Sequence, residues 1–305
     1  MINQDIFTNP EYIKENKEEG HAISLGYDSK EDALKNNNQS PYKAMLNGTW
    51  KFYHQMGMNN LPKNFYDVDF DDTQWNEIQV PSLWQLKGYS KPYYLAFAFP
   101  PAIETSRRMI PSIRENLNEI GIYRRNFQIP SYDKNRNYFL HFEGVKSAFN
   151  LYLNGKKVGY SQGSMTPSEF RITELLDAGK NQITVEVYRY SDGTYLEDQD
   201  MWFLSGIFRS VYIYSEPGTY IKDYFARCKF DKIYKNACYE MDLEISSNIS
   251  KNLLVKVSIK DEIEEELLFS QEIKVSQERI TDIFSQEWIN NQKNGVLKHP
   301  ICMMY

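Results

Sequence analysis

Residues 149–163, FNLYLNGKKVGYSQG, decide the fold class of this chain. Apolar side chains recur at every second position before a turn signal, which places them on one face of an extended strand: Phe149, Leu151 and Leu153. Asn154-Gly155 supplies the positive φ angles that a type I′ turn requires. Val158 and Tyr160 then begin the return strand. We therefore predict a β-hairpin, the basic unit of an antiparallel sheet.

Further short strands are predicted on both sides of this hairpin, at residues 121–130, 137–145, 181–190 and 208–216. In residues 181–190, Ile183, Val185 and Val187 alternate with Thr184, Glu186 and Tyr188, so one face is predicted to be buried and the other partly exposed to water. Residues 172–179, ITELLDAG, predict one short helix or helical turn, with Thr173 as cap and Gly179 as terminator. The pattern is typical of an all-β sandwich.

Composition favours the same fold class and excludes several functions. Aromatic residues make up 15% of the chain, and strands favour them because they pack across a pleated surface. The net charge of -6 comes without a basic run, which argues against a nucleic acid partner. No apolar segment is long enough for a membrane span or a signal peptide. The protein is expected to be cytoplasmic, with no membrane partner. Three cysteines without CxxC spacing argue against a disulfide framework and a thiolate zinc site.

The length of 305 residues suggests two domains behind a polar arm. Residues 1–45 are Asn-rich and read as an extended N-terminal arm, followed by a sandwich over residues 46–216. Pro217-Gly218 marks a boundary, after which residues 217–290 contain fewer aromatics and alternate like a smaller, immunoglobulin-like sandwich. That second domain is predicted to be incomplete, and residues 291–305 to form an irregular tail.

Five motifs carry a resemblance to a known family, and they occur in its order: NPEYIKENKEEGHA, LNGTWKF, VPSLWQLKGYSKPYY, FEGVKSAFNLYLNGKKVGYSQGSMTPSEF and RYSDGTYLEDQDMWFLSGIFRSVYIY. Over Asn9 to Tyr224 the chain resembles the N-terminal region of bacterial β-galactosidases of glycoside hydrolase family 2. The resemblance implies a jelly-roll, sugar-binding-type sandwich, then an immunoglobulin-like domain, then a (β/α)8 barrel. A barrel needs about 250 residues of alternating helix and strand, a pattern that this sequence lacks.

The absent barrel determines what the resemblance implies about chemistry. In the family, the general acid/base, the nucleophile and the magnesium ligands all lie on the barrel. No catalytic residue and no metal ligand is therefore assigned to this chain, which we expect to be inactive alone. No cofactor is implied here, although the family uses magnesium and sodium.

Two positions depart from the sugar contacts that the resemblance implies. Ala96 replaces an Asn that contacts the galactosyl group, and Gly163 replaces an Asp that reaches a sugar hydroxyl and the sodium ion. Both changes remove hydrogen-bonding groups. Phe97 and Gln162 remain as substrate-binding candidates beside them. Galactoside is therefore expected to bind weakly at best.

Residues 191–211 gather four carboxylates beside a Trp, and these side chains admit three interpretations: catalytic acids, a metal cage or structural contacts. Asp198 and Asp200 share one face if the segment is extended, about 7 Å apart, a spacing that leaves an inverting pair open. Neighbouring Arg189 and Arg209 would lower a carboxyl pKa, the wrong direction for a general acid. We therefore favour a structural or interface role for the set Asp192, Glu197, Asp198, Asp200, Trp202 and Arg209.

Three hypotheses of function follow. The chain associates with a separate barrel-bearing β-galactosidase chain or with itself; the sandwich alone is a carbohydrate-binding module; or the chain is the remnant of a truncated gene. An unfinished second sandwich would leave an exposed sheet edge, which favours a partner.

Overall fold

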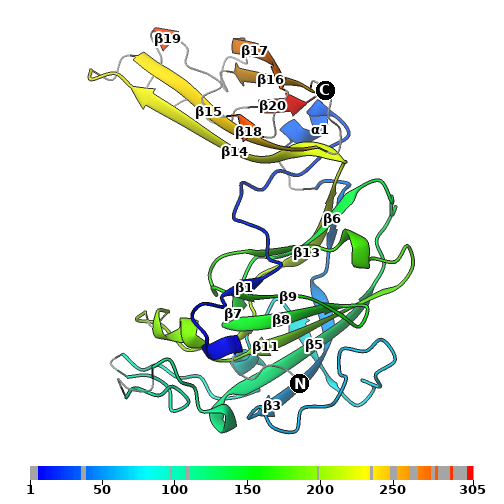
Figure 1. Cartoon of the computed structure of the whole chain (residues 1–305), viewed down its shortest axis with the longest axis vertical. Coiled ribbons are helices and arrows are strands. Elements are labelled where there is room, and N and C mark those ends of the chain that lie inside the picture. Colours follow the sequence, from blue (N-terminus) through cyan, green and yellow to red (C-terminus); the bar gives the residue numbers. More distant parts are fainter. Residues whose placement is uncertain are drawn as a thin grey trace. The chain divides into compact units, whose positions relative to one another are not determined.

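The computed structural model describes residues 6–35, 39–96, 98–106, 110–197, 199–233, 236–247, 253–260, 267–275, 279–280, 289–290 and 301–304. The chain divides into two compact units, residues 1–19 with 27–215 and residues 20–26 with 216–305. The described residues form an all-β fold with very little helix (Figure 1), which confirms the predicted fold class. None of the described helices has the length and apolar character needed to cross a membrane.

The larger sheet of the first unit contains the predicted hairpin near one edge. Its strand order is β1 (Lys14–Glu15), β9 (Lys156–Gln162), β8 (Ala148–Leu153), β11 (Asn181–Tyr188), β5 (Glu119–Phe127), β3 (Gly48–Met56) and β4 (Asn76–Val80). All neighbouring pairs are antiparallel. The central strands β8, β11 and β5 lie side by side in Figure 1.

A second sheet and a short ribbon complete the strands of this unit. The sheet order is β10 (Ser168–Arg171), β6 (Asn137–Phe142), β13 (Val211–Glu216) and β2 (Lys43–Met45), and the ribbon pairs β12 (Gly206–Ile207) with β7 (Val145–Lys146). The helical elements are α1 (Lys30–Leu34), η1 (Ile6–Thr8), η2 (Trp84–Lys87), η3 (Glu115–Leu117), η4 (Thr173–Leu175) and η5 (Asp192–Tyr195). Residues 1–45, read from the sequence as an arm, thus contribute β1 and β2 to the two sheets.

The central strands β8 and β11 of the larger sheet are buried on both faces. One apolar cluster joins it to the second sheet and contains Phe149, Leu151 and Leu153 together with Leu140, Phe170 and Ile213. The opposite face carries another cluster, in which Tyr152 and Tyr188 pack with Phe7 of η1 and with Phe65. The expectation that the second face of β11 is partly wet is wrong, because this extra layer leaves Thr184, Glu186 and Tyr188 buried.

The hairpin is confirmed, with a local irregularity in its return strand. Asn154 and Gly155 have φ angles of 50° and 77°, as a type I′ turn requires. Leu151 pairs with Gly159, but Tyr152 pairs with Lys157, so Val158 is the extra residue of a β-bulge. The bulge lets Val158 join the cluster between the sheets while Tyr160 joins the opposite one.

The predicted helix at residues 172–179 is a single 3-10 turn, η4. Thr173 does not cap it; instead its hydroxyl accepts a hydrogen bond from the Tyr138 N–H at 2.9 Å. The turn ends at Leu175, with Leu176 as its C-cap, rather than at Gly179.

The second unit contains two further sheets. One pairs β14 (Thr219–Phe230), β15 (Asn236–Ser247) and β18 (Arg279–Ile280), with β19 (Ile289–Asn290) also on β15; the other has the order β17 (Leu267–Val275), β16 (Leu253–Lys260) and β20 (Ile301–Met304). Buried side chains include Met241, Leu243, Val255 and Val257. Of the tail read as irregular, residues 291–300 and 305 lie outside the described residues, and the remainder forms β20.

Candidate functional site

The acidic segment after β11 is a helical turn followed by irregular chain, rather than an extended strand. Ser191 caps η5, and its N–H in turn donates to the Thr194 hydroxyl at 3.0 Å. Asp192, Glu197 and Asp200 therefore do not alternate between two faces of a strand, and each of these three has its own partners. Asp198 lies outside the described residues, so its predicted pairing with Asp200 stays a prediction.

Asp192 and Glu197 connect this segment to the end of β9. The Gln162 amide donates to Asp192 Oδ1 at 2.6 Å and to the Tyr160 hydroxyl at 2.8 Å. Glu197 accepts the Ser164 N–H at 2.8 Å and also the Ser164 hydroxyl. Burial raises the pKa of Asp192, opposed by the hydrogen bond from Gln162. Both carboxylates thus have structural partners.

Within the described chain, the two arginines expected to pair with this segment contact other groups. Arg189 forms a buried ion pair with Glu119 of β5. Arg209 donates to the Met165 carbonyl at 2.9 Å, from an exposed position. Neither arginine forms an ion pair with Asp192, Glu197 or Asp200. Instead, Glu119 also accepts hydrogen bonds from Ser90 at 2.8 Å and His54 at 2.9 Å.

Sequence reasoning missed four buried glutamates, Glu119, Glu169, Glu186 and Glu216, and burial or nearby groups shift the pKa of Glu119 and Glu186. Burial acts to raise the pKa of Glu119, but hydrogen bonds from His54 and Ser90 and the charge of Arg189 hold it below its usual value. Glu186, on β11, is 1% exposed and accepts a hydrogen bond from Asn150 at 3.0 Å; its burial raises the pKa. Charged residues within otherwise apolar strands are the signal that could have identified both. Because both are buried, neither contacts a substrate from solvent.

Replacing Glu186 by Gln is expected to stabilise the fold at neutral pH. Because the pKa of Glu186 is raised, its contribution to stability is fully present below its ordinary pKa of 4.5 and is lost as the pH rises through the folded-state pKa. A Gln has no such proton to lose, and its amide can donate to Asn150 Oδ1, which has no partner. Thermal unfolding from about pH 4 to pH 8 should show a Tm advantage of the variant that grows with pH. A constant or negative difference would contradict the raised pKa.

Of the predicted sugar contacts, Ala96 lies in a turn, Gln162 ends β9 and Gly163 follows it. Ala96 is exposed in a turn, and Phe97 lies outside the described residues. Gly163 is half-buried at φ +97°, next to the Ser164 that Glu197 binds. The Gln162 amide donates a hydrogen bond to Asp192. Gly163 offers no side-chain oxygen, and the described residues contain no group of three or more His, Cys, Asp or Glu side chains arranged to hold a metal. The residues present therefore do not fit the sodium ion that the resemblance implies.

Restoring an Asp at position 163 is expected to destabilise the fold. A Cβ there would lie 3.0 Å from the Thr166 hydroxyl at a positive φ, a conformation that costs an L-residue about 1–2 kcal/mol. Denaturant unfolding of Gly163→Asp should show this loss. The exposed variant Ala96→Asn serves as a control and should change stability by less than about 0.5 kcal/mol. Equal stability of Gly163→Asp and wild type would exclude strain at this position.

Tyr94, Asp200 and Trp202 form an exposed group. The Tyr94 hydroxyl donates to Asp200 Oδ1 at 2.5 Å, and this hydrogen bond raises the pKa of Tyr94. The Tyr94 and Trp202 ring centroids lie 5.6 Å apart with an interplanar angle of 44°. Sequence reasoning selected Asp200 and Trp202 but not Tyr94, which lies more than a hundred residues earlier in the chain.

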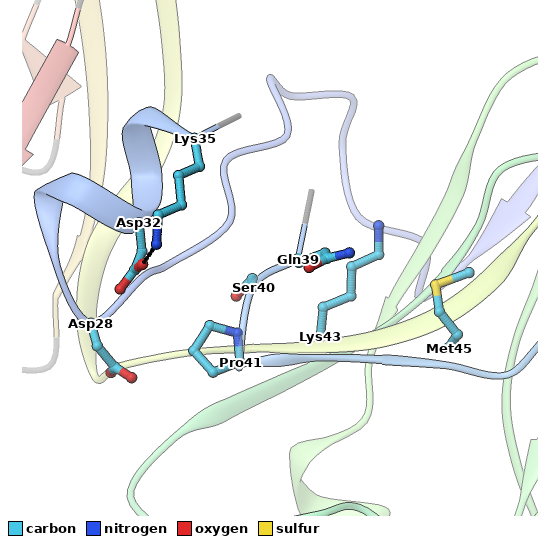
Figure 2. Close-up of a pocket in the computed structure, with 8 residues that line it drawn as sticks. All are labelled: Asp28, Asp32, Lys35, Gln39, Ser40, Pro41, Lys43 and Met45. Atoms are coloured by element: carbon cyan, nitrogen blue, oxygen red, sulfur yellow. Dashed lines mark hydrogen bonds and ion pairs between the residues drawn. The ribbon is translucent and has the colours of Figure 1, made fainter. Parts of the chain in front are cut away.

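A separate cavity of about 580 Å³ lies between α1 and the chain leading into β2 (Figure 2). It is lined by Asp28, Asp32, Lys35, Gln39, Ser40, Pro41, Lys43 and Met45. On the wall formed by α1, the Lys35 ammonium forms an ion pair with the Asp32 carboxylate at 2.6 Å. None of the predicted site residues lines this cavity.

Comparison with known proteins connects these features to one family. Residues 43–217 match the family described as "Glycosyl hydrolases family 2, sugar binding domain". The chain is 41% identical to a β-galactosidase of Priestia megaterium over 242 residues, covering 79% of this chain and 23% of the relative. It is 36% identical to a β-galactosidase of Halalkalibacterium halodurans over 266 residues, covering 87% of this chain and 26% of the relative. The chain thus spans about a quarter of the length of these relatives.

A solved structure shares the fold. Bacteroides uniformis β-glucuronidase 2, covalently bound to cyclophellitol-6-carboxylate aziridine, superposes with a TM-score of 0.59 at 19% identity. The match covers 85% of this chain and 28% of that one. At this identity the likeness concerns the fold alone.

Proposed function

This chain belongs to glycosyl hydrolase family 2, and from that premise we propose that it is the non-catalytic N-terminal portion of a β-galactosidase-like glycoside hydrolase. Hydrolysis of terminal β-D-galactosides would then take place on a region that this chain does not contain. The partner that we propose is a barrel-bearing β-galactosidase chain.

This proposal rests on the contacts that the carboxylates of this chain make. Asp192 and Glu197 bind Gln162 and Ser164 within the same unit, and Glu119 and Glu186 are buried. A glycosidase needs two carboxyl groups at the scissile bond, roughly 5 to 9.5 Å apart and open to the sugar. Asp192, Glu197, Glu119 and Glu186 serve structural contacts instead. The match covers only about a quarter of these relatives, which therefore have room for a catalytic region elsewhere.

Reconstitution tests the proposal. The remaining region of the Priestia megaterium β-galactosidase, produced as a separate chain, is mixed with this one and assayed with a chromogenic β-galactoside. Hydrolysis by the mixture but by neither component alone is the expected result. A stable complex of the two chains that stays inactive would contradict the proposal.

A second candidate function is carbohydrate binding by the sandwich itself. It is favoured by the exposed pair of Tyr94 and Trp202, which lies within the residues that match the family's sugar-binding domain. Ala96 and Gly163 offer no side-chain hydrogen bonds to a sugar, so binding would depend on these aromatic side chains.

A further inference from the structure

Glu186 lies in a row of polar side chains on the face of the larger sheet that points away from the second sheet. The strand register places Asn150 of β8 opposite Glu186 of β11, and Tyr160 of β9 opposite Asn150. All three side chains are buried. The Asn150 amide donates to the Glu186 carboxylate at 3.0 Å and to the Tyr188 hydroxyl at 2.9 Å. The carboxyl group of Glu186 is therefore held by hydrogen bonds inside the fold.

An early segment of the chain covers this row with aromatic rings. Residues 6–12, here called the strap, contain η1 and precede β1. Phe7 is stacked on Tyr188 with 5.2 Å between the ring centroids, and Tyr12 is stacked on Tyr160 at 5.5 Å. Phe7 is 2% exposed and belongs to the same buried cluster as both tyrosines that the strap covers. The strap thus shields from water the tyrosines next to the buried carboxyl group.

A second covering segment, residues 64–72, is anchored by charge. Its Tyr66 is stacked on Tyr152 with 4.8 Å between the ring centroids. Arg124 of β5 forms an ion pair with Asp72 at 2.8 Å. The same guanidinium donates to three backbone carbonyls of the segment, those of Phe65, Asp67 and Phe70. Because this anchor does not involve Glu186, we expect the strap, rather than residues 64–72, to respond to the charge of Glu186.

Among the groups that face Glu186, the carboxyl group itself is the one that changes charge near neutral pH. Burial raises its pKa, against the hydrogen bond from Asn150. Burial also raises the pKa of the surrounding tyrosine hydroxyls above their ordinary value of 10, so they keep their protons: Tyr12, Tyr152, Tyr160 and Tyr188. The other charged side chains on this face are in ion pairs, Lys157 of β9 with Glu15 of β1 and Arg124 with Asp72.

We propose that the strap is a proton-operated closure, which lies on the sheet while Glu186 carries its proton and opens when Glu186 ionises. A carboxylate buried without a paired cation is costly, and admitting water to it lowers that cost. Opening exchanges the stacking of Phe7 and Tyr12 for solvation of the charge. The closed strap is fully favoured below the ordinary glutamate pKa of 4.5, and this preference is lost as the pH rises through the folded-state pKa.

Amide hydrogen exchange of the full chain tests the proposal, measured from about pH 4.5 to pH 8 and corrected for the intrinsic effect of pH on exchange. Protection of the strap should fall by up to about tenfold per pH unit and then level off above the folded-state pKa of Glu186. Residues 64–72 should keep their protection. Glu186→Gln should hold the strap closed at every pH. Glu77→Gln, at an exposed position in β4, is the control and should behave like wild type.

A second variant keeps the test independent of how well Glu186→Gln folds. Phe7→Ala removes the ring that is stacked on Tyr188 and should leave the strap unprotected over the whole pH range. Corrected protection of the wild-type strap that does not change with pH would overturn the proposal, and so would the wild-type pH dependence in Glu186→Gln. Equal loosening of residues 64–72 would also contradict it, because the whole covering layer would then open.

Discussion

Arg189→Met is expected to lower the free energy of unfolding of the first unit by about 3–5 kcal/mol, the largest effect predicted for a single polar residue in this chain. The guanidinium is 2% exposed and its partner Glu119 is 3% exposed. Removing the arginine leaves the Glu119 charge buried with only Ser90 and His54 as partners. It also releases the Lys91 carbonyl. Chemical denaturation followed by far-ultraviolet circular dichroism measures the loss.

The control for this prediction is Arg209→Met, because Arg209 is exposed and bonds only carbonyl groups and a ring in the described chain. Its change should stay within about 0.5 kcal/mol of wild type. In the double variant Arg189→Met with Glu119→Gln, the two losses should not add, because the residues share one network. Additive losses of stability would show that the two residues do not stabilise the fold through a shared ion pair.

Leu151→Ala is expected to cost about 2–5 kcal/mol, because its side chain fills the space between the two sheets. Leu151 is fully buried and lies in the same cluster as Phe149, Leu153 and Phe170. The cavity left behind would be lined by side chains from both sheets, which cannot close it without moving a strand. Urea unfolding of the purified variant gives the difference.

Leu86→Ala is the matched control, since it removes the same atoms from a largely exposed side chain. We expect its unfolding midpoint to lie close to that of wild type. Similar losses for the two leucines would mean that β8 does not face the core that the hairpin pattern predicts.

The sequence predicted those parts of the fold that depend on local periodicity. Alternation identified the inward face of β8, and Asn154-Gly155 identified the turn because few other dipeptides tolerate two positive φ angles. The bulge at Val158 was not predictable, because an extra residue in one strand depends on its pairing with another. The helical turn at Thr173 was located correctly, but its capping was not.

The polar interior could not be predicted because it depends on contacts between distant segments. Glu186 was placed on a half-wet face, since alternation alone cannot reveal that Phe7 and Phe65 cover that face with a further layer. Arg189 was assigned to nearby acids, but sequence proximity does not determine pairing, and Glu119 lies opposite it across neighbouring strands. Tyr94 was missed as a partner of Asp200 for the same reason.

The central claim is that this chain alone does not hydrolyse β-galactosides, and one assay tests it most directly. The chain, purified from a host without β-galactosidase, is incubated at high concentration with o-nitrophenyl β-D-galactoside, and release of nitrophenol is followed against a buffer blank. The account predicts a rate equal to the blank. Turnover that rises in proportion to the concentration of this chain would contradict it.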